Sequence, residues 1–326
     1  MTKVLKETLV WDAHAGLFPS PDMDLNTLED WRTNDVDYLS INVGFDVMSR
    51  DETLATLAAY RRWLLEHSDR FLLAGTFADI DQAKRSGRLA VSFDIEGMNA
   101  LGGDINMVEI YHTLGVRQML FAYNLSNAAA GGCHDADIAL TPFGIDILAE
   151  MNRIGMIVDA SHTSYYTSMD LIERSTTPVV FSHSNPASVW QHQRNITDEQ
   201  IIACASKGGV IGLNGLAIFV GDNDTSTESL LHHLLTLIDL AGPAHVGLGF
   251  DYTPDVTVDI GAILRARPDY WPAGQQYDTR NIGHSGPSTI PHLVEGMQVR
   301  GFCAAEIEGI LGGNFARIAQ QSWMHY

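Results

Sequence analysis

The sequence predicts an α/β protein whose parallel strands close into a single (β/α)8 barrel. Short apolar runs alternate with amphipathic stretches from residue 8 to residue 250. Most runs are apolar at consecutive positions, as in Pro178-Val-Val-Phe181, which is typical of parallel strands covered on both faces. Eight such runs are present, and eight parallel strands close a barrel. A doubly wound open sheet is the alternative, but no GxGxxG motif or phosphate-binding loop follows the first run.

The expected strands are the apolar runs themselves, and each is bounded by polar or glycine-containing segments. In chain order they are Thr8–Ala13, Tyr38–Val43, Leu89–Ile95, Arg117–Ala122, Met156–Ala160, Pro178–Ser182, Val210–Leu213 and Val246–Phe250. No linker rich in Pro, Gly or Ser divides them. We therefore expect residues 1–326 to form one domain.

Helices are expected between the strands, and their start signals are clear. Asp51 opens an amphipathic stretch, Thr141-Pro142 puts proline in a first turn, and Thr197-Asp-Glu-Gln200 is a capping box. An apolar helix is expected over Leu230–Leu240, and a final helix over Glu306–Gln320. His232 and His233 are adjacent in the apolar helix, about 100° apart, so we expect them to be surface residues that cannot share an ion.

Composition excludes several classes of protein. The 20 Lys and Arg against 40 Asp and Glu give a net charge of −20, which would repel nucleic acid and anionic membrane surfaces. The 3 cysteines are odd in number and far apart, which argues against a disulfide scaffold. The sequence begins without an apolar signal region and holds no run of 18 apolar residues. We expect a cytoplasmic protein with a small-molecule substrate.

Imidazole and carboxylate groups follow the expected strands. In (β/α)8 barrels the catalytic residues lie at the carboxyl ends of the strands, which meet at one mouth. The residues there are His14, Glu96, His162, His183 and Asp251, at five of the eight expected ends. One such histidine alone would more often be structural. Five ends together have the composition of a metal or catalytic centre.

Six segments resemble the membrane (renal) dipeptidase family of zinc peptidases, peptidase family M19. They are Leu140-Thr-Pro-Phe-Gly144, Gly155-Met-Ile-Val-Asp-Ala-Ser-His162, Pro178-Val-Val-Phe-Ser-His-Ser184, Arg194-Asn195, Val246-Gly-Leu-Gly-Phe-Asp251 and Gly312-Gly-Asn-Phe-Ala-Arg317. The matching pieces are spread from about residue 9 to residue 317, so the resemblance covers essentially the whole chain. It implies a metallo-dependent hydrolase barrel of the amidohydrolase type with two zinc ions at its mouth.

The resemblance also implies roles for individual residues. Glu96 would bridge the two metals, His162 and His183 would complete one site, and His14 would belong to the other. Arg194 would bind the substrate carboxylate, since its guanidinium can form two parallel hydrogen bonds to a carboxylate. Asp251 would bind the substrate amino group or carry a proton.

The sequence departs from the family pattern at two positions. Gly16 stands where the family has a metal-binding Asp, and Tyr123 stands where it has a substrate-binding His. Tyr123 can still donate a hydrogen bond to a carbonyl or an oxyanion. Without a carboxylate at position 16, His14 and Glu96 alone should bind zinc weakly. Asp12, deeper in the barrel, would be either a further ligand or a group that orients His14.

We therefore expect one firmly bound zinc on Glu96, His162 and His183, and a second site that is weak or empty. Manganese, iron or cobalt would suit the same ligands. The expected activity is hydrolysis of a dipeptide or similar small amino-acid amide by metal-activated water. The alternative is a weakly active or non-catalytic barrel that binds a small ligand.

If position 16 limits activity, Gly16→Asp should raise occupancy of the second site and turnover. Such barrels are often homodimers, so a homodimer is a further expectation.

Overall fold

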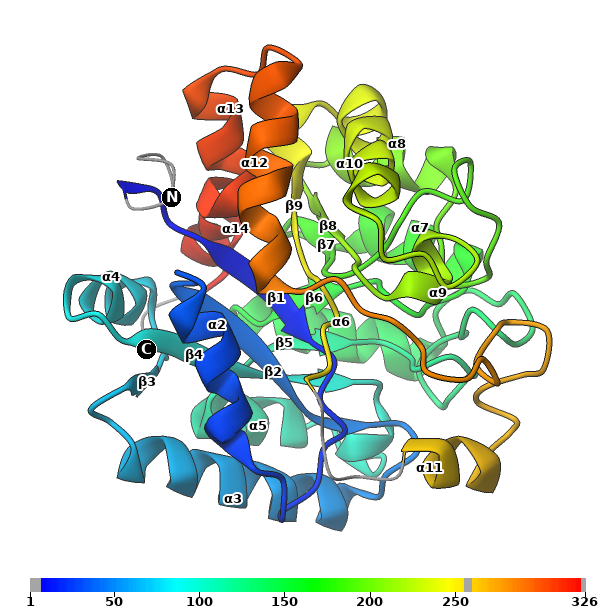
Figure 1. The fold of residues 1–326 in the computed structure, drawn as a ribbon. Helices are drawn as coiled ribbons and strands as arrows, with labels where there is room; N and C mark the ends of the chain where they lie inside the picture. The colour runs from blue at the N-terminus through cyan, green and yellow to red at the C-terminus, as the bar shows by residue number, and fades with distance from the viewer. Residues whose placement is uncertain (1–6, 255–259, 324–326) are drawn as a thin grey trace.

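The computed structural model of the chain describes residues 7–254 and 260–323 (Figure 1). Within these residues nine strands form one sheet, and all of their pairings are parallel. The strands are β1 Trp11–Ala15, β2 Tyr38–Phe45, β3 Phe71–Leu73, β4 Leu89–Glu96, β5 Val116–Leu120, β6 Ile157–Asp159, β7 Val179–Phe181, β8 Val210–Leu213 and β9 Val246–Leu248.

Eight of these strands close a ring, which confirms the predicted (β/α)8 barrel. The first strand β1 pairs with both β2 and β9, and β2 also pairs directly with β4. Strand β3 lies outside the ring. It pairs with Leu89–Val91 of β4, and the ring strand β5 pairs with Phe93–Glu96 of the same strand. Each of the eight expected strands overlaps one ring strand. Strand β3 was not predicted, because the short apolar run Phe71–Leu73 closely follows the stretch that forms α3 and cannot be told from a helical segment by periodicity alone.

Helices cover the outside of the barrel (Figure 1). Their bounds are α2 Glu29–Thr33, α3 Arg50–Glu66, α4 Phe77–Arg85, α5 Met107–Leu114, α6 Pro142–Ile154, α7 Tyr165–Arg174, α8 Asp198–Ser206, α9 Ala217–Val220, α10 Thr227–Ala241, α11 Ile260–Ala266, α12 Ile290–Val299, α13 Ala304–Glu308 and α14 Asn314–Ser322. Short 3-10 turns are η1 Leu25–Leu28, η2 Asn99–Leu101, η3 Pro243–His245 and η4 Pro287–Thr289, and η5 Gly309–Gly313 is a π-helical turn.

The predicted start signals act as expected. Thr141 caps α6 ahead of Pro142, and Thr197 and Gln200 form the capping box of α8. The expected final helix is divided by the π turn η5 into α13 and α14. None of the helices in the described part of the chain is long and apolar enough to cross a membrane.

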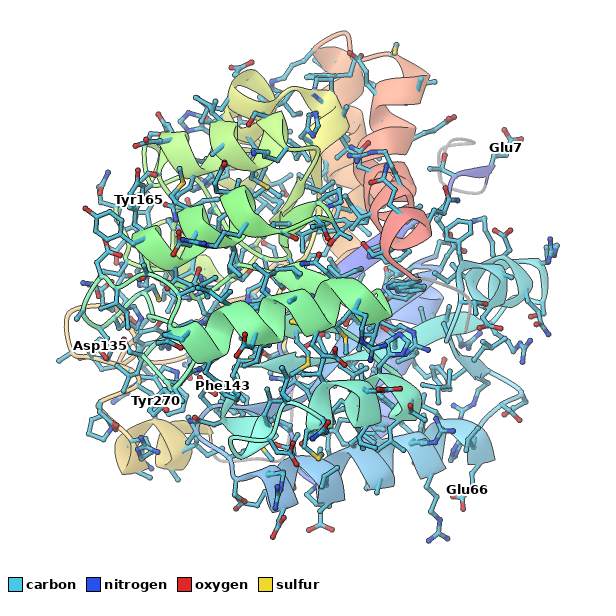
Figure 2. All side chains as sticks on the ribbon, turned by 180° about the vertical axis from the view of Figure 1, so that it is seen from behind. Glu7, Glu66, Asp135, Phe143, Tyr165 and Tyr270 are labelled. Atoms are coloured by element: carbon cyan, nitrogen blue, oxygen red, sulfur yellow. The ribbon has the colours of Figure 1, made fainter. Side chains whose placement is uncertain are left out.

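Apolar side chains fill the space between the strands and the helices, while charged groups such as Glu66 point outward (Figure 2). A separate cluster closes the amino-terminal end of the barrel. There Trp11 and Tyr38, the first residues of β1 and β2, stack at 3.7 Å, and Phe315 and Trp323 pack beside them. Because this end is filled with aromatic rings, the cavity lies at the other end of the barrel, where the strands have their carboxyl ends.

Candidate metal centre

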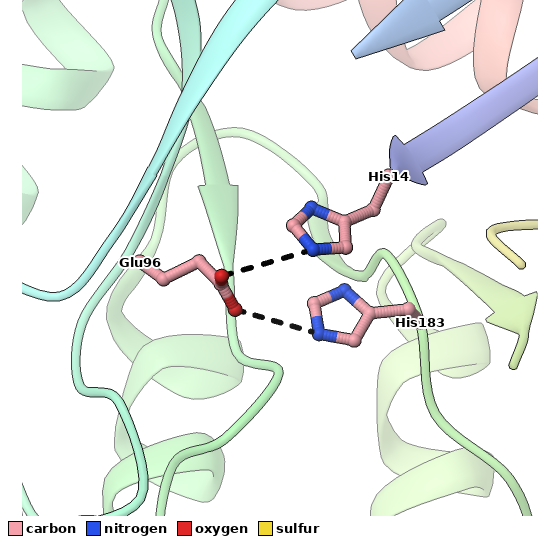
Figure 3. A group of neighbouring side chains, drawn as sticks. All are labelled: His14, Glu96 and His183. Carbon is pink, nitrogen blue, oxygen red and sulfur yellow. Dashed lines mark ion pairs between the residues drawn. The ribbon is translucent and has the colours of Figure 1, made fainter. Parts of the chain in front are cut away.

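Three side chains from distant strands point toward one another at the carboxyl end of the barrel (Figure 3). They are His14 near the end of β1, Glu96 at the end of β4, and His183 just after β7. Each can offer a ligand atom, and these atoms lie within 4.8 Å of one another. The residues expected from the strand ends therefore meet in space.

The Glu96 carboxylate lies between the imidazole rings. Its Oε2 is 3.1 Å from His162 Nε2 and 3.8 Å from His183 Nε2, and its Oε1 is 3.8 Å from His14 Nε2. The Nε2 atoms of His162 and His183 are 3.0 Å apart. One carboxylate oxygen thus faces two histidines and the other faces the third, which is the arrangement that a bridging carboxylate requires.

Hydrogen bonds on the far side of two of the rings orient the imidazoles of His162 and His183. His162 Nδ1 lies 2.6 Å from Asn124 Oδ1, and His183 Nδ1 lies 2.7 Å from Ser182 Oγ. Because the Nδ1 atoms are engaged, the Nε2 atoms are the ones presented to the centre. The sequence did not predict that Asn124 and Ser182 orient these rings, because this role depends on where the loops after β5 and β7 lie.

Asp94, rather than Asp12, lies against the outer nitrogen of His14. Asp94 Oδ1 is 3.3 Å from His14 Nδ1. Asp12 instead accepts hydrogen bonds from Trp31 Nε1 at 2.8 Å and from the backbone N–H of Phe250 at 3.0 Å. Asp12 Oδ1 also accepts a long hydrogen bond from the backbone N–H of His14 at 3.4 Å. Asp12 thus contacts the backbone of His14, while Asp94 is the carboxylate beside the His14 ring.

Burial and mutual charge shift the acid–base behaviour of the cluster. Burial raises the pKa of Glu96 to about 8. Burial lowers the pKa of His14, but the negative charges of Asp94 and Glu96 outweigh that effect and raise it to about 10. Burial, together with neighbouring positive charge, lowers the pKa of His162 and His183 well below the ordinary value. His162 and His183 are therefore neutral imidazoles that could bind a divalent cation directly, whereas binding of a cation to His14 and Glu96 would release their protons.

Backbone strain is concentrated at the same place. Asn124, His162 and Asp251 have φ values of 59°, 66° and 53°. This left-handed region costs a residue with a side chain roughly 1–2 kcal/mol. Three such residues after β5, β6 and β9 show that the surrounding packing holds the site in a conformation that the chain alone would not prefer.

Tyr123 forms a wall of the site. Its ring stacks on His162 with centroids 4.5 Å apart, and its hydroxyl accepts a hydrogen bond from Trp271 Nε1 at 3.2 Å. Burial raises the pKa of Tyr123 well above the ordinary value, so the hydroxyl keeps its proton. Trp271 was not identified from the sequence, because nothing local indicates that it reaches the barrel mouth.

A cavity of about 1000 Å³ opens above the cluster. Glu96, Tyr123, His162 and Asp251 line its floor, and apolar side chains line much of its wall. Its residues come from the loops after several strands and from the segment after α11, and they include Phe18, Phe45, Leu216, Phe219, Leu264 and Trp271. The centre is therefore accessible to a small organic molecule.

Arg194 is a buried cation beside the centre. It is only 2% exposed, its Nη2 donates to the carbonyl oxygen of His183 at 3.3 Å, and its guanidinium lies 5.2 Å from the Phe219 ring centre. Its Nε has no hydrogen-bond partner, and among residues 7–254 and 260–323 no carboxylate forms an ion pair with it. A buried charge without a counter-ion is costly, so the site is suited to an anionic ligand.

The fold and the site together define a class, a (β/α)8 barrel with a histidine–carboxylate metal centre at its mouth. The family model described as membrane dipeptidase (Peptidase family M19) matches residues 13–262. The chain therefore belongs to the membrane dipeptidase family, as the resemblance of its motifs indicated.

Similar proteins agree with this membership. Dipeptidase tcpJ of Claviceps purpurea is 30% identical over 278 residues, which is 84% of this chain and 60% of that protein. Dipeptidase verJ of Clonostachys rogersoniana is 30% identical over 77% of this chain and 60% of that protein. The chain thus spans 60% of the length of these two relatives.

Solved structures share the fold over nearly the whole chain. An amidohydrolase from Pseudomonas aeruginosa has a TM-score of 0.89 at 24% identity and covers 98% of both chains. A metallo peptidase from Rhodobacter sphaeroides, liganded with a phosphinate mimic of the dipeptide L-Ala-D-Ala, has a TM-score of 0.77 at 20% identity. It covers 97% of this chain and 100% of its own. At these identities the likeness establishes the barrel fold.

Proposed function

We propose that the protein is a metal-dependent dipeptidase that hydrolyses the amide bond of a dipeptide or a similar small amino-acid amide. The observation that carries this proposal is the position of Arg194 beside the Glu96 and histidine cluster, as a buried cation that forms no ion pair with a carboxylate of the described residues. A substrate with a free carboxylate would supply the missing charge and bring its amide bond to the cluster. Membership of the membrane dipeptidase family supports the same activity.

Zinc is the metal that we propose. Glu96, His162 and His183 would hold one ion, and His14 with Glu96 would contribute to a second. Zinc bound there would supply two effects, a lower pKa for a water molecule and polarisation of the substrate carbonyl. The ligand types would also accept manganese, iron or cobalt.

The remaining chemistry belongs to side chains of the cavity. Arg194 would bind the substrate carboxylate, and the Tyr123 hydroxyl would donate to the carbonyl oxygen as negative charge develops on it. The hydrogen bond from Trp271 Nε1 occupies one lone pair of the Tyr123 oxygen and so restrains where its proton points. Asp251 would accept a proton from the attacking water and transfer it to the leaving nitrogen. Asn214 Nδ2 donates to Asp251 Oδ2 at 3.1 Å and holds that carboxylate in place.

The cavity also bears on the choice of substrate. Its volume of about 1000 Å³ is at the upper end of the range of roughly 300–1000 Å³ for small-molecule pockets. Aromatic rings from Phe45, Tyr123 and Trp271 line one side. These features favour substrates with a bulky apolar side chain over dipeptides of small residues.

The test is a hydrolysis assay of the purified chain after removal of metal and after addition of zinc or manganese. The panel should pair dipeptides with aromatic and with small side chains, and each dipeptide with its carboxyl-terminal amide. We expect metal-dependent release of amino acids, fastest for aromatic dipeptides with a free carboxylate. Metal binding without hydrolysis of any panel member would favour the alternative, a barrel that binds a small ligand.

Three further expectations from the sequence stay predictions. They are a single domain over residues 1–326, a cytoplasmic location and a homodimer. Limited proteolysis, cell fractionation and light scattering would test them in turn.

A further inference from the structure

The space that a side chain at position 16 would need is already occupied. A Cβ atom added to Gly16 would lie 2.4 Å from Asp251 Oδ1 and 2.7 Å from the Asp251 carbonyl oxygen, closer than real contacts of this kind. The two segments are held together by backbone hydrogen bonds. The N–H of Asp251 donates to the His14 carbonyl at 3.1 Å, and the N–H of Gly16 donates to the Tyr252 carbonyl at 3.2 Å. The absence of a side chain at position 16 is therefore linked to the position of the Asp251 carboxylate.

The Asp251 carboxylate also lies where a ligand of the first metal site would be needed. Its Oδ1 is 3.7 Å from His14 Nε2, and Glu96 Oε1 is 3.8 Å from the same nitrogen. Two ligand atoms of a tetrahedral zinc, each about 2.1 Å from the ion, are about 3.4 Å apart. Both distances are close to that separation.

The two oxygens of Asp251 face different partners. Asn214 Nδ2 donates to Oδ2, and Asn214 is itself held because its side-chain oxygen accepts from the backbone N–H of Leu216 at 2.7 Å. Oδ1 is left facing His14. Asp251 also has a left-handed backbone, with φ of 53°.

We propose that Asp251 is the third protein ligand of the first metal site, together with His14 and Glu96. This inference rests on the proposed metal-dependent function. In it, Asp251 from the loop after β9 supplies the carboxylate that position 16 lacks. The first site then has three protein ligands and is no longer the weak site expected from the sequence. The chain binds two ions, and Asp251 holds metal through Oδ1 as well as taking part in proton transfer.

Zinc counts on purified variants test the proposal without reference to activity. After loading with zinc and desalting, elemental analysis of the unsubstituted chain should give two ions per chain. Asp251→Asn and Asp251→Ala should each retain one, with the affinity for the second ion at least 100-fold weaker by calorimetric titration. Asp278→Asn is the matched control, because Asp278 is an exposed carboxylate on the rim of the same cavity. It should retain both ions.

Substitutions at position 16 test the proposal independently of changes to Asp251. Gly16→Ala removes no ligand, yet its Cβ would displace the Asp251 carboxylate, so it too should lose the second ion. Gly16→Asp should fail to raise zinc occupancy for the same reason, contrary to the expectation drawn from the sequence alone. Two tightly bound ions in Asp251→Asn, or a single ion in the unsubstituted chain, would overturn the proposal.

Diffraction at the zinc absorption edge keeps the test decisive if a variant fails to fold. Crystals of the unsubstituted, zinc-loaded chain should show Asp251 Oδ1 within about 2.0–2.2 Å of an ion. An ion on His14 and Glu96 without Asp251 would contradict the proposal. A chain that binds two zinc ions in this way but hydrolyses no dipeptide would contradict the proposed function and leave this inference standing.

Discussion

Individual side chains of the centre differ in how far the sequence could predict them. His14, Glu96, His162 and His183 follow strands whose ends could be located from apolar runs, so their convergence was expected. Trp271 was not expected, although its indole contacts the Tyr123 hydroxyl. It lies in an irregular segment far along the chain, and only the path of that segment over the barrel mouth brings the two rings together.

Arg194 gives a test at the scale of one residue. Arg194→Met should raise KM and lower kcat/KM for a dipeptide by roughly 10- to 100-fold, since a hydrogen bond to a charged group contributes roughly 1.5–3 kcal/mol. The carboxyl-terminal amide of the same dipeptide should be affected much less, because it offers no carboxylate. Steady-state kinetics on the two substrates measure this difference.

A rim residue supplies the control for this test. Arg280 lines the cavity and is exposed, so Arg280→Met should leave the preference for the free carboxylate unchanged. An equal loss on the acid and the amide in Arg194→Met would mean that Arg194 only supports the fold.

The packing of helix α10 differs from the expectation that both of its histidines lie on the surface. His232 is exposed as predicted, but the prediction for His233 was wrong: it is fully buried, and its Nε2 lies 2.9 Å from the Val220 carbonyl oxygen. The helix packs against both α8 and α12, so its buried face is wide. The sequence placed the two histidines about 100° apart, but it could not show which of them the neighbouring helices would cover.

The buried imidazole predicts a pH dependence of stability. Burial lowers the pKa of His233 from 6.5 to about 4. Between these values the unfolded chain binds a proton that the folded chain does not, so stability falls as pH drops from 6.5 toward 4. The loss approaches about 3 kcal/mol at the acid end of this window. Urea unfolding of His233→Asn should therefore show a weaker dependence on pH than the unsubstituted chain.

The adjacent residue is the matched control. His232→Asn, on the exposed side of α10, should keep most of the pH dependence, because burial is the main cause of the lowered pKa of His233 and the charge of His232 only a smaller one. Identical pH profiles for His233→Asn and the unsubstituted chain would show that His233 does not carry this effect.

The two ends of the described chain meet when the barrel closes. A Cβ on Gly312, in the π turn η5, would lie 2.3 Å from the Leu9 carbonyl oxygen and 3.1 Å from the Trp11 backbone nitrogen. The C-terminal helices thus lie directly against the start of β1, as Figure 1 shows. Because the backbones touch, only glycine fits at this position.

This contact predicts a loss of stability from one methyl group. Gly312→Ala should lower the free energy of unfolding by about 1–3 kcal/mol, the usual cost of overpacking. Gly313→Ala is the control, since Gly313 is exposed and a Cβ atom there would come no closer than 3.3 Å, to the Glu308 carbonyl oxygen. It should stay within about 1 kcal/mol of the unsubstituted chain or be slightly more stable. Equal effects in urea unfolding would mean that the contact with β1 is not important for stability.

The sequence by itself determined the barrel, its eight ring strands, the family and the residue types at the strand ends. These follow from local patterns, because apolar runs and capping residues act within one element. Only the tertiary structure decided that Asp251 fills the space beside Gly16, that His233 is covered, and that Arg194 is buried with no ion pair to a carboxylate in residues 7–254 and 260–323. Each of these depends on a distance between residues far apart in the chain, and such distances exist only once the loops and helices have packed together.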